Sequence, residues 1–382
     1  MSAASPADTA TDTPRSAQIG ALDGIRGVAV GLVVWLHLRA DQMPGGWVGM
    51  SVFFPLSGFL MTRLVLNEHH HNDGAVRLRR FWLRRARRLL PAHYAMLVAV
   101  GLLLVLGGTW ANGDGGAMLS SLLYSNNWWQ LGHSVDYWSQ FSSRVSPFQH
   151  LWSLSVEEQF YVLWPVVMVL AMKRARRPLR AIWLTSCAVA ALGLAYGLII
   201  TRAGWGGPTD VYYNTGVRGA ELLAGSALAA LMAGRPQIWT SARARRALDI
   251  AAGACLVAIG YTSITLDASA SRFIADGGMF VTGIATVIII ASATRGGAVE
   301  TFLALAPLRW LGTRCYSLYL WHWPIIAMVT RESSGLRGWW LTTAQIVITF
   351  AATVLSYWLV EEPIRHGLRA TRRKWSRNPV MA

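Results

Sequence analysis

The stretch GIRGVAVGLVVWLH, residues 24–37, is an apolar segment with an ionisable residue near each end. Arg26 lies close to its start, and His37 closes it. Such a run favours a membrane-spanning helix, because about 20 apolar residues cross a bilayer in that form. An arginine inside the hydrocarbon core costs about 2.5 to 3.5 kcal/mol on insertion scales. Ionisable residues that occur in a membrane helix despite this free-energy cost are therefore candidate functional residues.

The rest of the chain has the same apolar character. Of its 382 residues, 53% are hydrophobic and only 14% are charged, whereas roughly a quarter are charged in average soluble domains. The pattern predicts an all-α, polytopic membrane bundle of about ten transmembrane helices. The expected spans are about 20–39, 46–66, 90–108, 152–172, 181–200, 212–233, 247–266, 274–293, 314–331 and 340–360. We therefore expect a multi-pass protein of the cell membrane, and we place it in a bacterial plasma membrane.

Positive charge is concentrated in alternate connections between these spans. The net charge is +16, with 35 Lys and Arg residues, which in a soluble protein would suggest nucleic acid. If the N-terminus is cytoplasmic, most of them fall in inside segments, such as 77–88, 173–180 and 235–246. The positive-inside rule therefore predicts an N-in and C-in orientation. Anionic bilayer lipids are the expected counter-charge, and no nucleic-acid partner is expected.

Polar segments flank the apolar region. Residues 1–18 contain no apolar core, so we expect a disordered cytoplasmic tail rather than a signal peptide. Residues 365–382 are expected to form a basic cytoplasmic tail, which leaves 19–364 as one transmembrane domain. The histidine triplet at 69–71 is typical of a solvated loop, and we predict no metal site.

Arg26 and His37 cannot contact each other. They lie nearly on one face of the helix, but eleven residues separate them by about 16 Å along its axis. Arg26 is either an interfacial charge paired with Asp23 or a ligand-binding group. His37 is either a structural hydrogen-bonding group or a general base, since its proton affinity lies nearest neutrality.

The third span begins with a cluster of arginines in FWLRRARRLLP, residues 81–91. Arg84, Arg85 and Arg88 share much of one helix face, and Pro91 is expected to break or kink the helix. The cluster is either a positive-inside anchor or a site for phosphate groups of a cytosolic ligand.

The fourth span contains two adjacent acids in QHLWSLSVEEQFYVLWP, residues 149–165. Glu157 and Glu158 lie at roughly the depth of His37, but they cannot point the same way. We expect one of them in a cavity and the other on an Arg or Trp donor. A carboxylate beside the histidine would orient its ring. Further candidates are Ser153, Trp128, His322 and the pair Arg218 and Glu221, which could simply neutralise each other.

Two function classes fit these residues. One is an enzyme that takes a phosphorylated cytosolic donor and acts on a second substrate in or across the membrane. The other is a proton-coupled transporter or exporter, since chains of His, Glu and Arg also relay protons. The sequence has no nucleophile elbow, zinc-protease motif, P-loop or dinucleotide fingerprint in a fitting context. ATP hydrolysis, zinc proteolysis and nicotinamide chemistry are therefore disfavoured.

The motifs together resemble the acyltransferase 3 family of integral-membrane acyltransferases over about residues 20–366. They occur in the family's order: LDGIRGVAVGLVVWLH, VGMSVFFPLSGFLM, FWLRRARRLLP, LWSLSVEEQFYVLWP, RGAELLAG, YSLYLWHWP and YWLVEEPIR. The resemblance implies transfer of an acyl group, usually acetyl, from acyl-CoA as co-substrate, with no permanently bound cofactor. The acceptor would be a hydroxyl of a carbohydrate, glycolipid, cell-envelope glycan or macrolide-like metabolite. Met50 and Pro55 depart from the residues that many relatives have there.

The resemblance also implies roles for individual residues. The family's Arg-x10-His motif falls on Arg26 and His37, and its arginine motif falls on Arg85 and Arg88, with Arg84 as a third candidate. The arginines would bind the phosphates of CoA, while His37 would deprotonate the acceptor hydroxyl or carry the acyl group.

The glutamate of the same family would orient that imidazole, and it falls on Glu157 or Glu158, of which we favour Glu158. Many members that modify surface glycans also carry a C-terminal esterase-like domain. The sequence ends at 382 without one, so we do not expect two-step transfer through such a domain within it.

Overall fold

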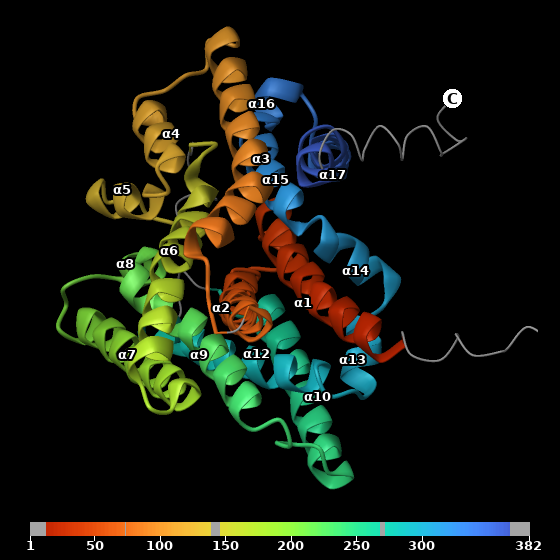
Figure 1. Cartoon of the computed structure of the whole chain (residues 1–382). Helices are drawn as coiled ribbons and strands as arrows, with labels where there is room; N and C mark the ends of the chain where they lie inside the picture. The colour runs from red at the N-terminus through yellow and green to blue at the C-terminus, as the bar shows by residue number, and fades with distance from the viewer. Residues whose placement is uncertain (1–12, 73, 139–145, 268–271, 367–382) are drawn as a thin grey trace, which may run out of the picture.

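The computed structural model describes residues 13–72, 74–138, 146–267 and 272–366. These residues form helices and no strand (Figure 1), which confirms the all-α prediction. The long helices are α1 (Thr13–Leu38), α2 (Val48–His71), α3 (Leu78–Leu106), α6 (Trp152–Arg174), α7 (Pro178–Arg202), α9 (Thr215–Gly234), α10 (Ala242–Thr265), α12 (Gly278–Ala293), α15 (Cys315–Met328) and α17 (Gly338–Ser356). The short helices are α4 (Asp114–Leu122), α5 (Asn126–Gly132), η2 (Gln149–Leu151), α8 (Pro208–Tyr213), α11 (Arg272–Ala275), α13 (Ala298–Leu303), α14 (Ala306–Thr313), α16 (Arg331–Ser334), η3 (Tyr357–Glu361) and α18 (Glu362–His366).

Among the described residues, eight helical stretches are long and apolar enough to cross a membrane. The two other predicted spans coincide with shorter helices, α12 with 16 residues and α15 with 14. At 1.5 Å per residue, each is shorter than a hydrocarbon core of about 30 Å. The total of ten spans and the N-in, C-in orientation therefore stay predictions.

Three local expectations differ from the structure. α3 runs through Pro91 as one continuous helix, so the arginine cluster and the third span form a single element. α2 extends to His71, which places the histidine triplet in its last turn rather than in a loop. α1 begins at Thr13, inside the segment expected to be a tail. Residues 1–12 and 367–382, which make up most of both predicted tails, lie outside the described residues.

α2 and α9 form the centre of the bundle. In each, 72% of the apolar stretch is buried inside the protein, compared with 17% in α10. The two helices cross very closely, because glycines face the partner's backbone: a Cβ on Gly58 would lie 1.8 Å from the Leu222 carbonyl oxygen. A Cβ on Gly225 would lie equally close to the carbonyl oxygen of Pro55. Figure 1 shows α2 near the middle of the molecule, and it contacts α1, α9 and α12.

α1 is held at both of its ends. Toward its N-terminal end it packs on α13 and α14, where a Cβ on Gly24 would lie 1.8 Å from the carbonyl oxygen of Leu303. Near its C-terminal end, the His37 ring contacts those of His322 and Trp323 on α15. α15 therefore lies along α1. It places His322 and Trp323, which come late in the sequence, next to His37.

Candidate active site

Two buried histidines from distant parts of the chain form a hydrogen-bonded pair. His37 lies in the last turn of α1, and His322 lies in α15. Nδ1 of His37 is 2.9 Å from Nε2 of His322, and the ring centroids are 5.1 Å apart. Nδ1 of His322 is in turn 2.7 Å from the backbone carbonyl oxygen of Tyr319.

This series of contacts assigns the protons. A carbonyl oxygen can only accept, so Nδ1 of His322 carries a proton that it donates to Tyr319. In the neutral ring, Nε2 of His322 then accepts, which makes Nδ1 of His37 a donor. The lone pair of a neutral His37 is thereby placed on Nε2. That nitrogen can take a proton from a hydroxyl.

A third buried histidine, His150, lies against this pair, and the sequence analysis did not select it. Its ring is 5.5 Å from that of His322 in a T-shaped arrangement. Its backbone carbonyl accepts a hydrogen bond of 2.7 Å from the Tyr319 hydroxyl, which also lies 2.6 Å from Ser153 Oγ. His150 is in η2, directly before α6, and its place one residue ahead of the LWSLSVEEQ motif is the signal that could have identified it.

A cleft of about 120 Å³ is lined in part by Tyr319, whose ring contacts those of His150 and His322. It joins five helices and brings together several predicted site residues that are far apart in the sequence. Ser153 and Tyr319 line its buried end, and the rings of Tyr319 and His322 have centroids 5.2 Å apart. The lining residues are Arg26, Met50, Phe53, Ser57, Arg85, Arg88, Leu89, Ser153, Leu154, Glu157, Tyr161, Cys315, Tyr316 and Tyr319.

The two glutamates have different environments, and neither makes the hydrogen bond that orients His37. Glu157 lines the cleft, where its carboxylate accepts hydrogen bonds from Ser57 Oγ at 2.8 Å and from the Tyr161 hydroxyl at 3.3 Å. Glu158 binds the Arg85 guanidinium through Nη2 at 2.9 Å and Nε at 3.2 Å. One acid thus faces the cavity while the other pairs with an arginine.

The predicted donor-binding arginines divide into two groups. Arg26, Arg85 and Arg88 line the cleft, whereas Arg84 makes a 2.5 Å ion pair with Glu68 at the protein surface. Arg26 also forms a 2.7 Å ion pair with Asp23, the pairing that the sequence left open.

The Arg85 guanidinium stacks 3.3 Å from the ring centre of Tyr161. Together with its two hydrogen bonds to Glu158, this contact fixes the plane of the guanidinium in the cleft wall.

Arg218 and Glu221 form a separate, fully buried ion pair of 2.9 Å on α9. Ser51 Oγ donates to the same carboxylate at 3.2 Å, and the Arg218 guanidinium lies 4.7 Å from the ring centre of Phe54. Neither member of the pair lines the cleft. Their contacts join α9 to α2, which favours a structural role.

Trp128 lies outside the cleft, in an apolar groove of about 610 Å³ between α3 and α6. Its indole Nε1 donates to Thr215 Oγ1 at 3.2 Å. Tyr124 lines the same groove, and burial raises the pKa of its phenol above the usual range, so it stays neutral. Arg85, Leu89 and Tyr161 line both the groove and the cleft, which makes the two cavities neighbours.

The comparison with known proteins supports the family resemblance that the sequence motifs indicate. Two relatives are the peptidoglycan O-acetyltransferase OatA of Listeria monocytogenes, 34% identical over 360 residues, and the O-acetyltransferase OatA of Staphylococcus aureus, 33% identical over 357 residues. These alignments cover 91% and 90% of this chain but 56% and 57% of the relatives. The chain therefore spans little more than half the length of the relatives it matches. No solved structure matches it at a significant level.

The family model for an acyltransferase domain matches residues 19–362. That range includes the histidine pair, His150 and every residue that lines the cleft. The chain thus belongs to the acyltransferase 3 family.

Proposed function

We propose that this chain is a membrane O-acyltransferase that moves an acetyl group from acetyl-CoA to a hydroxyl of a cell-envelope glycan. Family membership and the names of the relatives support the reaction class and the acceptor class. One observation carries the proposal: the hydrogen bond to His322 places the lone pair of His37 on Nε2, and the ring of Tyr319 connects this histidine pair to an arginine-lined cleft.

The donor would lie only partly inside the cleft. Its volume of about 120 Å³ is far below the roughly 300 to 1,000 Å³ of pockets that enclose drug-sized ligands. The narrow thioester arm would therefore enter the cleft, while the nucleotide stays at the protein surface. Arg26, Arg85 and Arg88 would then hold the phosphates, because guanidinium groups bind phosphate oxygens in pairs.

His37 would act as the general base. Its Nε2 takes the proton of the acceptor hydroxyl while the hydroxyl oxygen attacks the thioester carbonyl carbon. The carbon–sulfur bond breaks, and the CoA thiolate leaves with the proton that the imidazolium returns. During this step, His322 accepts the Nδ1 hydrogen bond of the charged ring and stabilises it. General base catalysis of this kind contributes roughly 10²- to 10⁴-fold to the rate.

The two glutamates would shape the donor site rather than orient the base. Glu157 holds the hydroxyls of Ser57 and Tyr161 at the cleft wall. Glu158 holds the guanidinium of Arg85 at the cleft wall, where this group would contact a donor phosphate.

The test uses the purified chain in lipid nanodiscs with acetyl-CoA labelled in the acetyl group and with peptidoglycan fragments as acceptors. We expect acetyl-dependent release of free CoA and labelled glycan. His37→Gln should lower both by about 10²-fold or more, with unchanged expression and gel-filtration behaviour. If the wild-type chain releases no CoA, and proteoliposomes instead move a solute along a proton gradient, the chain is a transporter and the proposal is wrong.

A further inference from the structure

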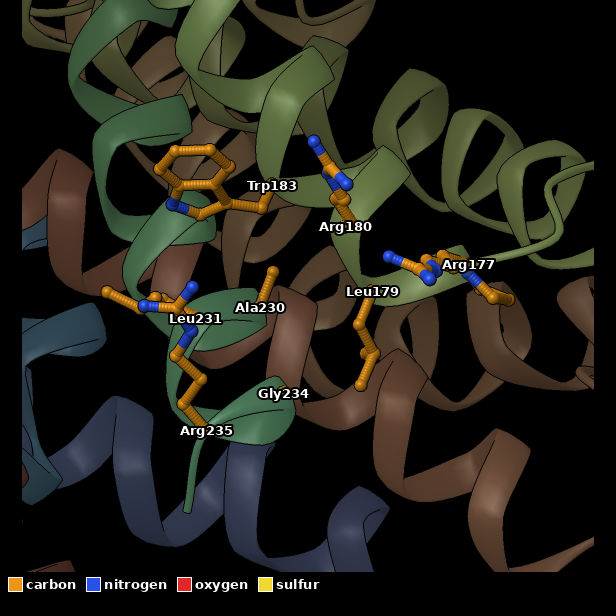
Figure 2. Close-up of a pocket in the computed structure, with 9 residues that line it drawn as sticks. Arg177, Leu179, Arg180, Trp183, Ala230, Leu231, Gly234 and Arg235 are labelled. Carbon is orange, nitrogen blue, oxygen red and sulfur yellow. The ribbon is translucent and has the colours of Figure 1, made fainter. Parts of the chain in front are cut away.

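A third cavity lies between α7 and α9, away from the cleft of the candidate active site. Its volume is about 670 Å³, and its lining comes from the first turns of α7 and the last turns of α9. Figure 2 shows Arg177 and Arg180 on the α7 side, Arg235 at the end of α9, and Trp183 beside them. None of these residues lines the catalytic cleft.

The cavity carries positive charge without a protein counter-charge. None of its nine lining residues is acidic. In the described part of the chain, none of the three arginines forms an ion pair. α7 starts with Pro178, has no acidic residue in its first turn and has no side-chain cap. The N-terminal backbone N–H groups of this helix add further positive potential.

The rest of the lining is apolar and continues toward the membrane. Leu179, Trp183 and Leu231 contribute hydrocarbon surface to the cavity. Only 28% of the apolar stretch of α7 is buried inside the protein, and its Leu184 side chain is 47% exposed, so much of this helix faces lipid. A ligand with an anionic head and hydrocarbon chains fits this combination of surfaces.

We propose that this cavity is a specific binding site for the phosphate head group of an anionic phospholipid. The guanidinium groups of Arg177, Arg180 and Arg235 bind the phosphate oxygens, and the acyl chains lie along the exposed face of α7. Basic pockets between membrane helices are suited to such head groups, and each surface arginine contributes about fivefold in affinity for anionic lipid. A lipid with two phosphates, such as cardiolipin, binds more tightly than one with a single phosphate.

The main test is native mass spectrometry of the whole chain with defined lipids. We expect the wild-type chain to retain cardiolipin and phosphatidylglycerol in preference to phosphatidylcholine. Replacing Arg177, Arg180 and Arg235 together by Gln should lower retention of the anionic lipids by about tenfold or more. The matched control replaces Arg174, Arg243 and Arg246 by Gln; these arginines are also exposed but do not line the cavity. The control should retain anionic lipid like the wild type.

A second variant fills the cavity without changing the charge. A Cβ on Gly234 would lie 3.7 Å from Leu179, an ordinary contact, so Gly234→Leu should fold and occupy the cavity. It should also lose lipid retention although all three arginines remain. Equal loss in the control triple variant would show diffuse charge attraction and overturn the site, as would equal retention of phosphatidylcholine.

The phosphates of a nucleotide or inorganic phosphate could bind the same arginines. We therefore add CoA or inorganic phosphate to the lipid-loaded chain and expect neither to displace the lipid at millimolar concentration. Displacement of the lipid by CoA would assign the cavity to a nucleotide and overturn the proposal.

Discussion

At the scale of single residues, His322 determines which nitrogen of His37 is basic. Its Nδ1 is committed to the Tyr319 carbonyl, so its Nε2 accepts the proton of His37 Nδ1. Replacing His322 by Ala would remove this acceptor and leave a cavity beside the ring. His37 could then turn or change tautomer, and its lone pair would no longer be fixed on Nε2.

We therefore expect His322→Ala to lower kcat by about 10²-fold, with little change in KM for acetyl-CoA. His322→Gln should recover part of this loss, because its amide oxygen can accept the same hydrogen bond. The measurement is CoA release over a range of acetyl-CoA concentrations. His70→Ala is the control, since His70 is exposed at the end of α2. A His322→Gln variant no more active than His322→Ala would argue for a role other than hydrogen bonding.

Arg85 gives a second prediction at this scale. Lys keeps the charge but loses the two-point contact with Glu158 and the stacking on Tyr161. We expect Arg85→Lys to raise KM for acetyl-CoA by about tenfold, as loss of one charge-assisted hydrogen bond would, while kcat changes little. Arg87→Lys, an exposed neighbour that does not line the cleft, is the matched control. An unchanged KM in Arg85→Lys would remove Arg85 from donor binding.

The sequence could predict His37 and the arginines as candidates, because a charge in an apolar run is visible locally. It could not predict the partner of His37, which lies 285 residues away. The glutamates were expected near the ring from their depth in the membrane and from the family resemblance. The depth of a residue in the membrane does not determine where its side chain points. In the structure, Glu157 accepts a hydrogen bond from Ser57, and Glu158 accepts one from Arg85.

At the scale of elements, the glycines between α2 and α9 determine how the cleft is built. α2 carries Met50, Phe53 and Ser57 of the cleft wall, so its distance from α9 affects the position of that wall.

The hydropathy of the sequence predicted most long helices, since apolar runs are a local property. α12 and α15 are shorter than the predicted spans, with 16 and 14 residues, and hydropathy alone did not indicate where they begin and end.

Gly225→Ala should therefore destabilise the protein. The new Cβ would lie 1.8 Å from the Pro55 carbonyl oxygen, which forces the two backbones apart at a cost of at least about 1 to 3 kcal/mol. The midpoint of thermal aggregation in detergent should fall, and acetyl transfer should fall with it. Gly219→Ala on the same helix is the control, because no atom lies within 4 Å of its Cβ position. Equal midpoints for the two variants would contradict the close crossing.

At the scale of the whole molecule, the contacts of α1 bear on the number of spans. The residues around Gly24 pack on α13 and α14, while His37 near the other end contacts α15. α15 itself starts at Cys315, which lines the cleft with Arg26, and reaches the level of His37 through His322. The segment that joins α12 to α15 therefore lies at the N-terminal end of α1, which favours ten spans over eight.

This argument predicts the side of the membrane for single introduced cysteines. In a chain whose three native cysteines are replaced by Ala, Thr301→Cys reports on α13 and Trp205→Cys reports on the connection after α7; both positions are exposed. With ten spans and a cytoplasmic N-terminus, a membrane-impermeant maleimide should label Trp205→Cys on intact cells. It should label Thr301→Cys only after permeabilisation. If α12 and α15 do not cross, Thr301→Cys will be labelled on intact cells, and reversed labelling of both positions would invert the predicted orientation.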